Sequence, residues 1–167
     1  MMLTYDAACH HPIQLDANRR RHMTFQEILK IRTDSHEGLY DITARVRAVI
    51  ERSGIKTGIA SVFARGATAA IMIQENWDAS VQTDVINLLD KLIPQGVWIH
   101  DRQDGNGAAH LKSGLIGPEK SLPVIERAPG LSTWQNIFFC EFDGPRRERE
   151  IADRKSTRLN SSHEWIS

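Results

Sequence analysis

The segment from His100 to His110, HDRQDGNGAAH, holds side chains that could do chemistry. Gly105 and Gly107 favour a loop that brings backbone close to a ligand. Imidazole and carboxylate groups ligate zinc, nickel or manganese, and a histidine beside an aspartate can transfer a proton. The segment therefore predicts one of three things. It is a metal site on His100 and His110 with Asp101 or Asp104, an acid–base site, or a polar surface loop.

Three further pairs of residues could bind a ligand: Glu75–Asn76, Trp134–Gln135 and Arg146–Arg147. The first pair ends an expected buried strand, where polar groups either serve a site or cap the next helix. The second pair could stack on and hydrogen-bond a ring-shaped ligand, unless the tryptophan belongs to the core. The third pair could bind phosphate as a fork of donors, or simply end a strand at the surface.

The elements that must position these groups follow from the apolar periodicity. Strands are expected at residues 25–33, 59–63, 68–74, 122–125 and 134–142. Two main helices are expected, one with its apolar face at 42–50 and an end at Gly54, the other with a stripe at 81–92 and a stop at Pro94. A short helical turn is expected at 108–113. The pattern predicts one α+β domain of packed, largely antiparallel β-sheets.

Composition excludes several classes of protein. The 167 residues carry a formal net charge of zero, so a strongly basic nucleic-acid surface is not expected. No apolar stretch has the length of a membrane span, and the start lacks the pattern of a signal peptide. The sequence has no GxGxxG, P-loop, GxSxG or HExxH motif. With only two cysteines we expect a cytoplasmic protein, and Cys140, in an apolar strand, should be a buried structural thiol.

Both ends of the chain differ from the middle. Residues 1–22 have no clear period, and Met23 stands directly before the first expected strand, so we expect a disordered or mis-assigned extension. The tail from Asp153 to Ser167, DRKSTRLNSSHEWIS, shows no strand or helix period. Its first eleven residues resemble the in-frame translation of a sequencing adapter. The expected domain therefore covers residues 23–152.

Several motifs in one order resemble the YjbQ-like family, whose members have been described as secondary thiamine-phosphate synthases. The matching stretches are GATAAIMIQENWD at 66–78, DVINLLDKLIP at 84–94, HDRQDGNGAAHLKSGLIGP at 100–118 and LSTWQNIFFCEFDGPR at 131–146, with a weaker match at 39–54. The resemblance implies an α+β domain with packed sheets, a homotrimer, and sites near subunit contacts.

The resemblance also implies a polar pocket. Its catalytic residues would be Glu75, His100, Asp101 and His110, and its substrate-binding residues Thr68, Asn76, Asn106, Ser113, Trp134, Gln135 and Arg146, with Glu141 nearby. The family's first histidine falls at Gly66 here, followed by Ala67, and Ala108 replaces a frequent acidic residue. A three-histidine metal site cannot form, although His100 and His110 could still hold a metal more weakly with a carboxylate or water.

Three functions remain open. The first is a thiamine-phosphate synthase, which joins a pyrimidine pyrophosphate to a thiazole phosphate and needs Mg²⁺ on the pyrophosphate. The second is a hydrolase that uses a transition metal such as Zn²⁺ on the two loop histidines, with Glu75 as general base. The third is a non-catalytic trimeric module that binds phosphate or a small phosphorylated metabolite. None of the three involves nucleic acid or a membrane.

Overall fold

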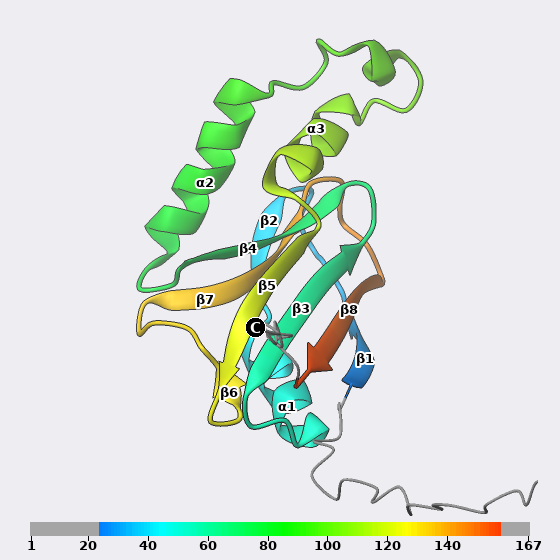
Figure 1. Cartoon of the computed structure of the whole chain (residues 1–167). Coiled ribbons are helices and arrows are strands. Elements are labelled where there is room, and N and C mark those ends of the chain that lie inside the picture. The colour runs from blue at the N-terminus through cyan, green and yellow to red at the C-terminus, as the bar shows by residue number, and fades with distance from the viewer. Residues whose placement is uncertain (1–23, 158–167) are drawn as a thin grey trace, which may run out of the picture.

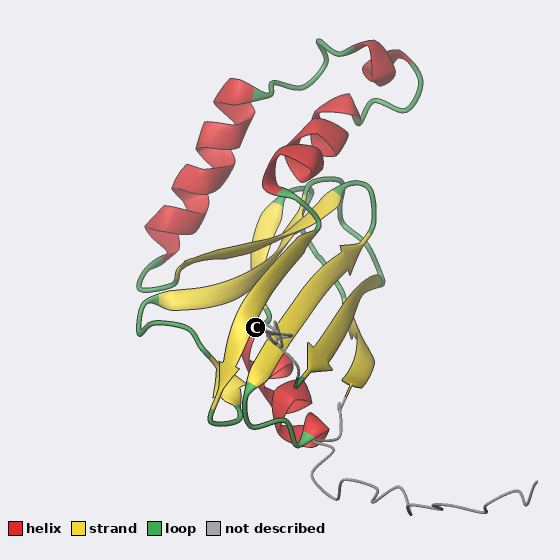
Figure 2. Ribbon diagram, viewed as in Figure 1, coloured by secondary structure: helices red, strands yellow, loops and turns green. Residues whose placement is uncertain are grey.

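The computed structural model describes residues 24–157. The N-terminal extension expected at residues 1–22 and positions 158–167 of the tail lie outside this range. Within it, two antiparallel sheets pack against each other (Figures 1 and 2). The α+β class with largely antiparallel sheets is therefore confirmed.

Sheet A has five strands in the order β1-β8-β3-β5-β6, and sheet B has three in the order β2-β7-β4. The strands of sheet A are β1 Thr24–Ile31, β8 Arg149–Ser156, β3 Gly58–Arg65, β5 Glu119–Ile125 and β6 Ala128–Pro129. Those of sheet B are β2 Gly38–Asp41, β7 Gln135–Glu141 and β4 Ala69–Glu75. Gly66 and its neighbours make the turn from β3 to β4, where the chain changes sheet.

Strand β7 is apolar on both faces because each face meets a different part of the core. Ile137 and Phe139 join the main cluster, which fills the space between the two sheets and α1. Cys140 joins a second cluster, in which Leu89 of α2 and Ala109 of α3 cover the other face of sheet B. Side chains alternate along a strand, so one strand can supply both clusters.

Three α-helices complete the fold of residues 24–157, where the sequence predicted two main ones and a short helical turn. Helix α1, Thr43–Ser53, ends at Gly54, whose φ of 69° needs the freedom of glycine. Helix α2, Ala79–Leu92, starts at Asp78, whose carboxylate accepts from the Ser80 amide at 2.8 Å. Helix α3, Gly107–Ile116, extends the helical turn expected at 108–113 in both directions. A 3-10 turn, η1, spans Ile99–Arg102.

Strand β8 continues beyond the point where the sequence pattern stops. Asp153 to Ser156 lie in the strand and pair with β1 on one side and β3 on the other. The expectation that residues after Ala152 have no strand structure is therefore wrong for these four. Hydrogen bonds to two neighbouring strands place them in the sheet although their side chains suit the position poorly. The alternation of Ile151 continues with Asp153 and Lys155, so both charges point into the core and are fully buried.

The buried Asp153–Lys155 ion pair predicts that apolar residues would stabilise the protein. Apart from each other, the Asp153 carboxylate and the Lys155 ammonium have no hydrogen-bond partner among the described residues. Replacing a buried ion pair by well-packed apolar residues commonly gains about 1–4 kcal/mol. The double variant Asp153→Val, Lys155→Leu should raise the free energy of unfolding in urea by an amount in this range.

The pH dependence of unfolding gives an independent check. Burial lowers the pKa of Lys155 to about 7, far below its value in the unfolded chain. Above pH 7 the native Lys155 is therefore a neutral amine beside Asp153, whereas the unfolded chain keeps the proton up to about pH 10. The stability of the parent chain should rise across that interval. Lys155→Leu should flatten the rise. An equal slope in both proteins, or a less stable double variant, would contradict the assignment.

Candidate functional site

His100 and His110 lie together in the structure and form part of a pocket. Their ring centroids are 5.0 Å apart and the rings are nearly perpendicular, at 83°. His100 comes from η1 and His110 from the first turn of α3, so the geometry that a free loop would leave open is set by two short helices. The pocket has a volume of about 500 Å³. Its lining consists of Trp98, Ile99, His100, Gly107, His110 and Leu111.

The Asp101 carboxylate joins two walls of this pocket by hydrogen bonds, an arrangement that we call the Asp101 clamp. One carboxylate oxygen accepts from the Trp98 amide and the other from the Gly107 amide, each at 2.8 Å. Gly107 is required there because a Cβ would approach the Asp101 carboxylate to 2.8 Å. Asp101, predicted as catalytic, thus positions two pocket walls. Asp104 is the carboxylate that faces His100, 3.8 Å from its Nε2 atom.

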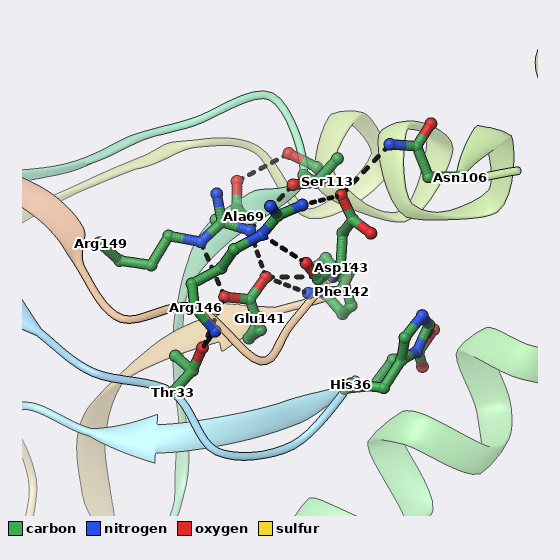
Figure 3. Close-up of polar contacts among 12 residues, drawn as sticks. Thr33, His36, Ala69, Asn106, Ser113, Glu141, Phe142, Asp143, Arg146 and Arg149 are labelled. Carbon is green, nitrogen blue, oxygen red and sulfur yellow. Dashed lines mark hydrogen bonds and ion pairs between the residues drawn. The ribbon is translucent and has the colours of Figure 1, made fainter. Parts of the chain in front are cut away.

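A second polar cluster joins the two sheets around Glu141 (Figure 3). The buried Glu141 carboxylate accepts from the Arg149 guanidinium, with 2.7 Å from Nε, and from the Thr33 hydroxyl at 3.0 Å. Arg149 also donates to the Thr68 hydroxyl at 3.0 Å. Thr68, predicted to bind substrate, is therefore part of this network. A Cβ at Gly66 would lie 3.2 Å from Arg149, so the position of the family's first histidine adjoins this cluster.

Asn106 and Arg146, two further predicted binding residues, meet at Asp143. The Asp143 carboxylate accepts from Arg146 at 2.6 Å and from the Asn106 amide at 3.2 Å (Figure 3). The amide oxygen of Asn106 is buried and has no partner among the described residues. Ser113 donates its hydroxyl to the Ala69 carbonyl at 2.7 Å, which fixes α3 on the start of β4.

Glu75, Asn76, Trp134 and Gln135 lie at the other end of β4. Glu75 pairs with Gln135, six residues along the strand from Ala69. That length of strand spans roughly 20 Å. Helix α3, which carries His110, is bonded to the Ala69 end of β4, so within one chain this group does not share the histidine pocket. Asn76 donates to Asp41 at 2.9 Å and accepts from Gln82 at 2.8 Å. The prediction of a single pocket containing Glu75 and both histidines is not met within one chain.

Sequence reasoning missed Lys112. This residue is fully buried, and its ammonium contacts Glu37 at 2.7 and 2.9 Å and Asp90 at 2.5 Å. These bonds connect α3 to α2 and to the start of β2. The sequence did hold a signal for a buried lysine: Lys112 stands among the small and apolar residues of GAAHLKSGLI, and residues of those types are usually buried.

The described part of the chain has no group of three histidine, cysteine or acidic side chains placed to hold a metal ion. His100 and His110 bring two imidazoles, and no third ligand from residues 24–157 joins them. Cys140 is buried, and burial raises the pKa of its thiol to about 12. The prediction of a buried structural thiol is confirmed.

Comparison with known proteins now defines the class. The family model described as UPF0047 protein YjbQ-like matches residues 27–155. The UPF0047 protein MJ1081 of Methanocaldococcus jannaschii is 45% identical over 118 residues, which cover 71% of this chain and 85% of that protein. UPF0047 protein YugU of Bacillus subtilis is 39% identical over 121 residues, 71% of this chain and 89% of its own.

A solved structure agrees with these sequence relatives. The crystal structure of a YbjQ-like protein of unknown function from Sulfolobus solfataricus P2 superposes with a TM-score of 0.79 at 34% identity. The match covers 83% of this chain and all of that one. The chain belongs to the YjbQ-like UPF0047 family. Among the described helices, none has the length and apolar character needed to cross a membrane.

The role of Asp101 predicts a specific loss of stability. Asp101→Ala leaves the Trp98 and Gly107 amides without their acceptor, which should lower the free energy of unfolding by about 1–3 kcal/mol. Asp101→Asn keeps one acceptor and should lose less. Asp104→Ala is the matched control, since Asp104 is exposed and should change stability by less than about 0.5 kcal/mol. Equal effects of the Asp101→Ala and Asp104→Ala variants would contradict the clamp.

Proposed function

We propose that this protein binds a small phosphorylated metabolite, without turning it over, in the pocket of His100 and His110. The observation that carries the proposal is the meeting of two imidazoles at the N-terminus of α3. The N–H groups of the two histidines can donate to an anion such as phosphate, while the Gly107 amide at the start of α3 is already bonded to Asp101. Trp98, Ile99 and Leu111 give the pocket apolar walls that suit the organic part of such a ligand.

We further propose that three copies associate through the surface of α2, α3 and the segment joining them. This surface exposes six large apolar side chains: Leu88, Leu92, Val97, Ile99, Leu111 and Leu115. A monomer rarely leaves so many in water on neighbouring elements, and a second copy is the occupant that the family resemblance implies. Association would place other chains beside the histidine pocket, because Ile99 and Leu111 belong to both.

The synthase and the hydrolase rank below the binding module. Asp101, a predicted metal ligand, already accepts from two backbone amides. Arg146, a predicted phosphate ligand, is paired with Asp143 at 2.6 Å. Glu75, the predicted general base of a hydrolase, lies at the far end of β4 from the two histidines. Both reactions therefore need groups that one chain does not bring together.

Ligand binding is tested by calorimetry on the full chain. We expect the pyrimidine pyrophosphate and the thiazole phosphate to bind more tightly than inorganic phosphate, because only they contact the apolar walls. His100→Ala and His110→Ala should each weaken binding roughly tenfold, the value of one charge-assisted hydrogen bond. His36→Ala is the control, since His36 lines a different cavity. Equal affinity in all four proteins would contradict the proposal.

The same samples separate the alternatives. If thiamine phosphate and pyrophosphate form from the two precursors with Mg²⁺, the protein is a synthase and the proposal of a non-catalytic binding module is wrong. Bound zinc in the purified protein that disappears in His110→Ala would instead support the hydrolase.

The trimer is tested by sedimentation velocity. The parent chain should sediment as three copies, and Leu92→Glu should shift it towards the monomer because a charge in an apolar contact is costly. Ile125→Glu is the matched control, since Ile125 is an exposed apolar residue at the β5–β6 hairpin. A monomeric parent protein at micromolar concentration would rule out the assembly.

A further inference from the structure

Two tryptophans form an exposed corner at the end of sheet B, where β4 leads into α2 (Figure 1). The rings of Trp77 and Trp134 are 4.8 Å apart between centroids and stand at 81° to each other. Trp77 is 71% exposed and Trp134 is 51% exposed. The possibility that Trp134 is a core residue is therefore excluded, and two large indole surfaces remain available to a ligand.

The corner rests on a rigid support. The Asn76 amide donates to the Trp134 carbonyl at 3.1 Å, which joins the segments that carry the two rings. The Asn76 side chain is held by Asp41 and Gln82, and the Ser132 amide donates to the Gln135 side chain at 3.0 Å. Both rings thus project from backbone that adjoins the β4–β7 ladder. Ligand binding therefore costs little conformational entropy.

The surroundings of the corner are acidic. Residues 39–43, 74–82 and 131–136 are joined there by strand pairing and hydrogen bonds, and they contain Asp41, Glu75 and Asp78 but no lysine or arginine. Arg45, the next basic residue along α1, donates instead to the Lys30 carbonyl at 2.7 Å. Glu75, adjacent in sequence to Asn76, forms no ion pair with any described residue. Negative charge without a basic partner favours a cation at this end of the sheet.

We propose that the Trp77–Trp134 corner binds the methylated ammonium group of a small organic cation such as choline. Indole faces attract such a group through cation–π contacts, and nearby carboxylates add long-range attraction. Within one chain the site is separate from the histidine pocket, since it lies at the opposite end of β4. The sequence predicted that Trp134 could stack on a ring-shaped ligand. The ligand proposed here is an organic cation instead.

The test compares choline with its neutral carbon isostere, 3,3-dimethylbutan-1-ol, by calorimetry on the full chain. Choline should bind saturably in the millimolar range or below, and the isostere should bind at least tenfold more weakly. Trp77→Ala and Trp134→Ala should each weaken choline binding about tenfold. Glu75→Gln should weaken it severalfold and reduce its dependence on salt.

Trp98→Ala is the matched control, because it removes an indole from the histidine pocket and should leave choline affinity unchanged. Circular dichroism shows whether each variant is folded, and Trp77→Ala changes the more exposed of the two rings. Three results would overturn the proposal: no saturable choline heat, equal affinity for the isostere, or unchanged affinity in a folded Trp77→Ala protein.

Discussion

The buried pair of Arg149 and Glu141 is the interaction on which the two-sheet architecture depends. Glu141 ends β7 in sheet B and Arg149 begins β8 in sheet A, so their contact joins the sheets at one end of the core. The Thr33 hydroxyl and the amides of Phe142 and Asp143 also donate to the carboxylate. A buried charge pair stabilises only when its remaining hydrogen-bonding capacity is satisfied, and here each oxygen has several donors. The turns that leave both sheets, including the one through Thr68, are held by the same cluster.

A second buried cation organises the helices. Lys112 links α3 to Asp90 on α2 and to Glu37 before β2. Helix α2 buries only Leu89 among its residues, so apolar contact alone holds it weakly to the sheet. The lysine therefore fixes how the segment between α2 and α3 returns to the body, and that segment carries His100 and the Asp101 clamp. The histidine pocket thus depends on the ion pairs of Lys112, which fix α3 relative to α2, as much as on its own residues.

Local patterns predicted much of the fold. Gly54 and Pro94 marked the ends of the two main helices through backbone requirements that do not depend on distant contacts. The apolar residues at 59–63 and 134–142 predicted strands, because burial leaves a direct trace in sequence. Strand β2 and the end of β8 left no such trace. Their pairing comes from neighbours more than 90 residues away in sequence, as in Gly38 opposite Glu141 and Lys155 opposite Ala60.

The sequence by itself determined the family, the sheet-rich α+β core and the presence of His100 and His110 in one polar segment. It did so because motifs, periodicity and short spacings are properties of neighbouring residues. Only the tertiary structure decided that Asp101 is a clamp, that Lys112 is a buried link, and that Glu75 lies at the opposite end of a strand from the histidines. It also decided that Trp134 is exposed beside Trp77. These outcomes depend on which distant segments pack together, and a side chain's chemistry is set by the partners that packing gives it.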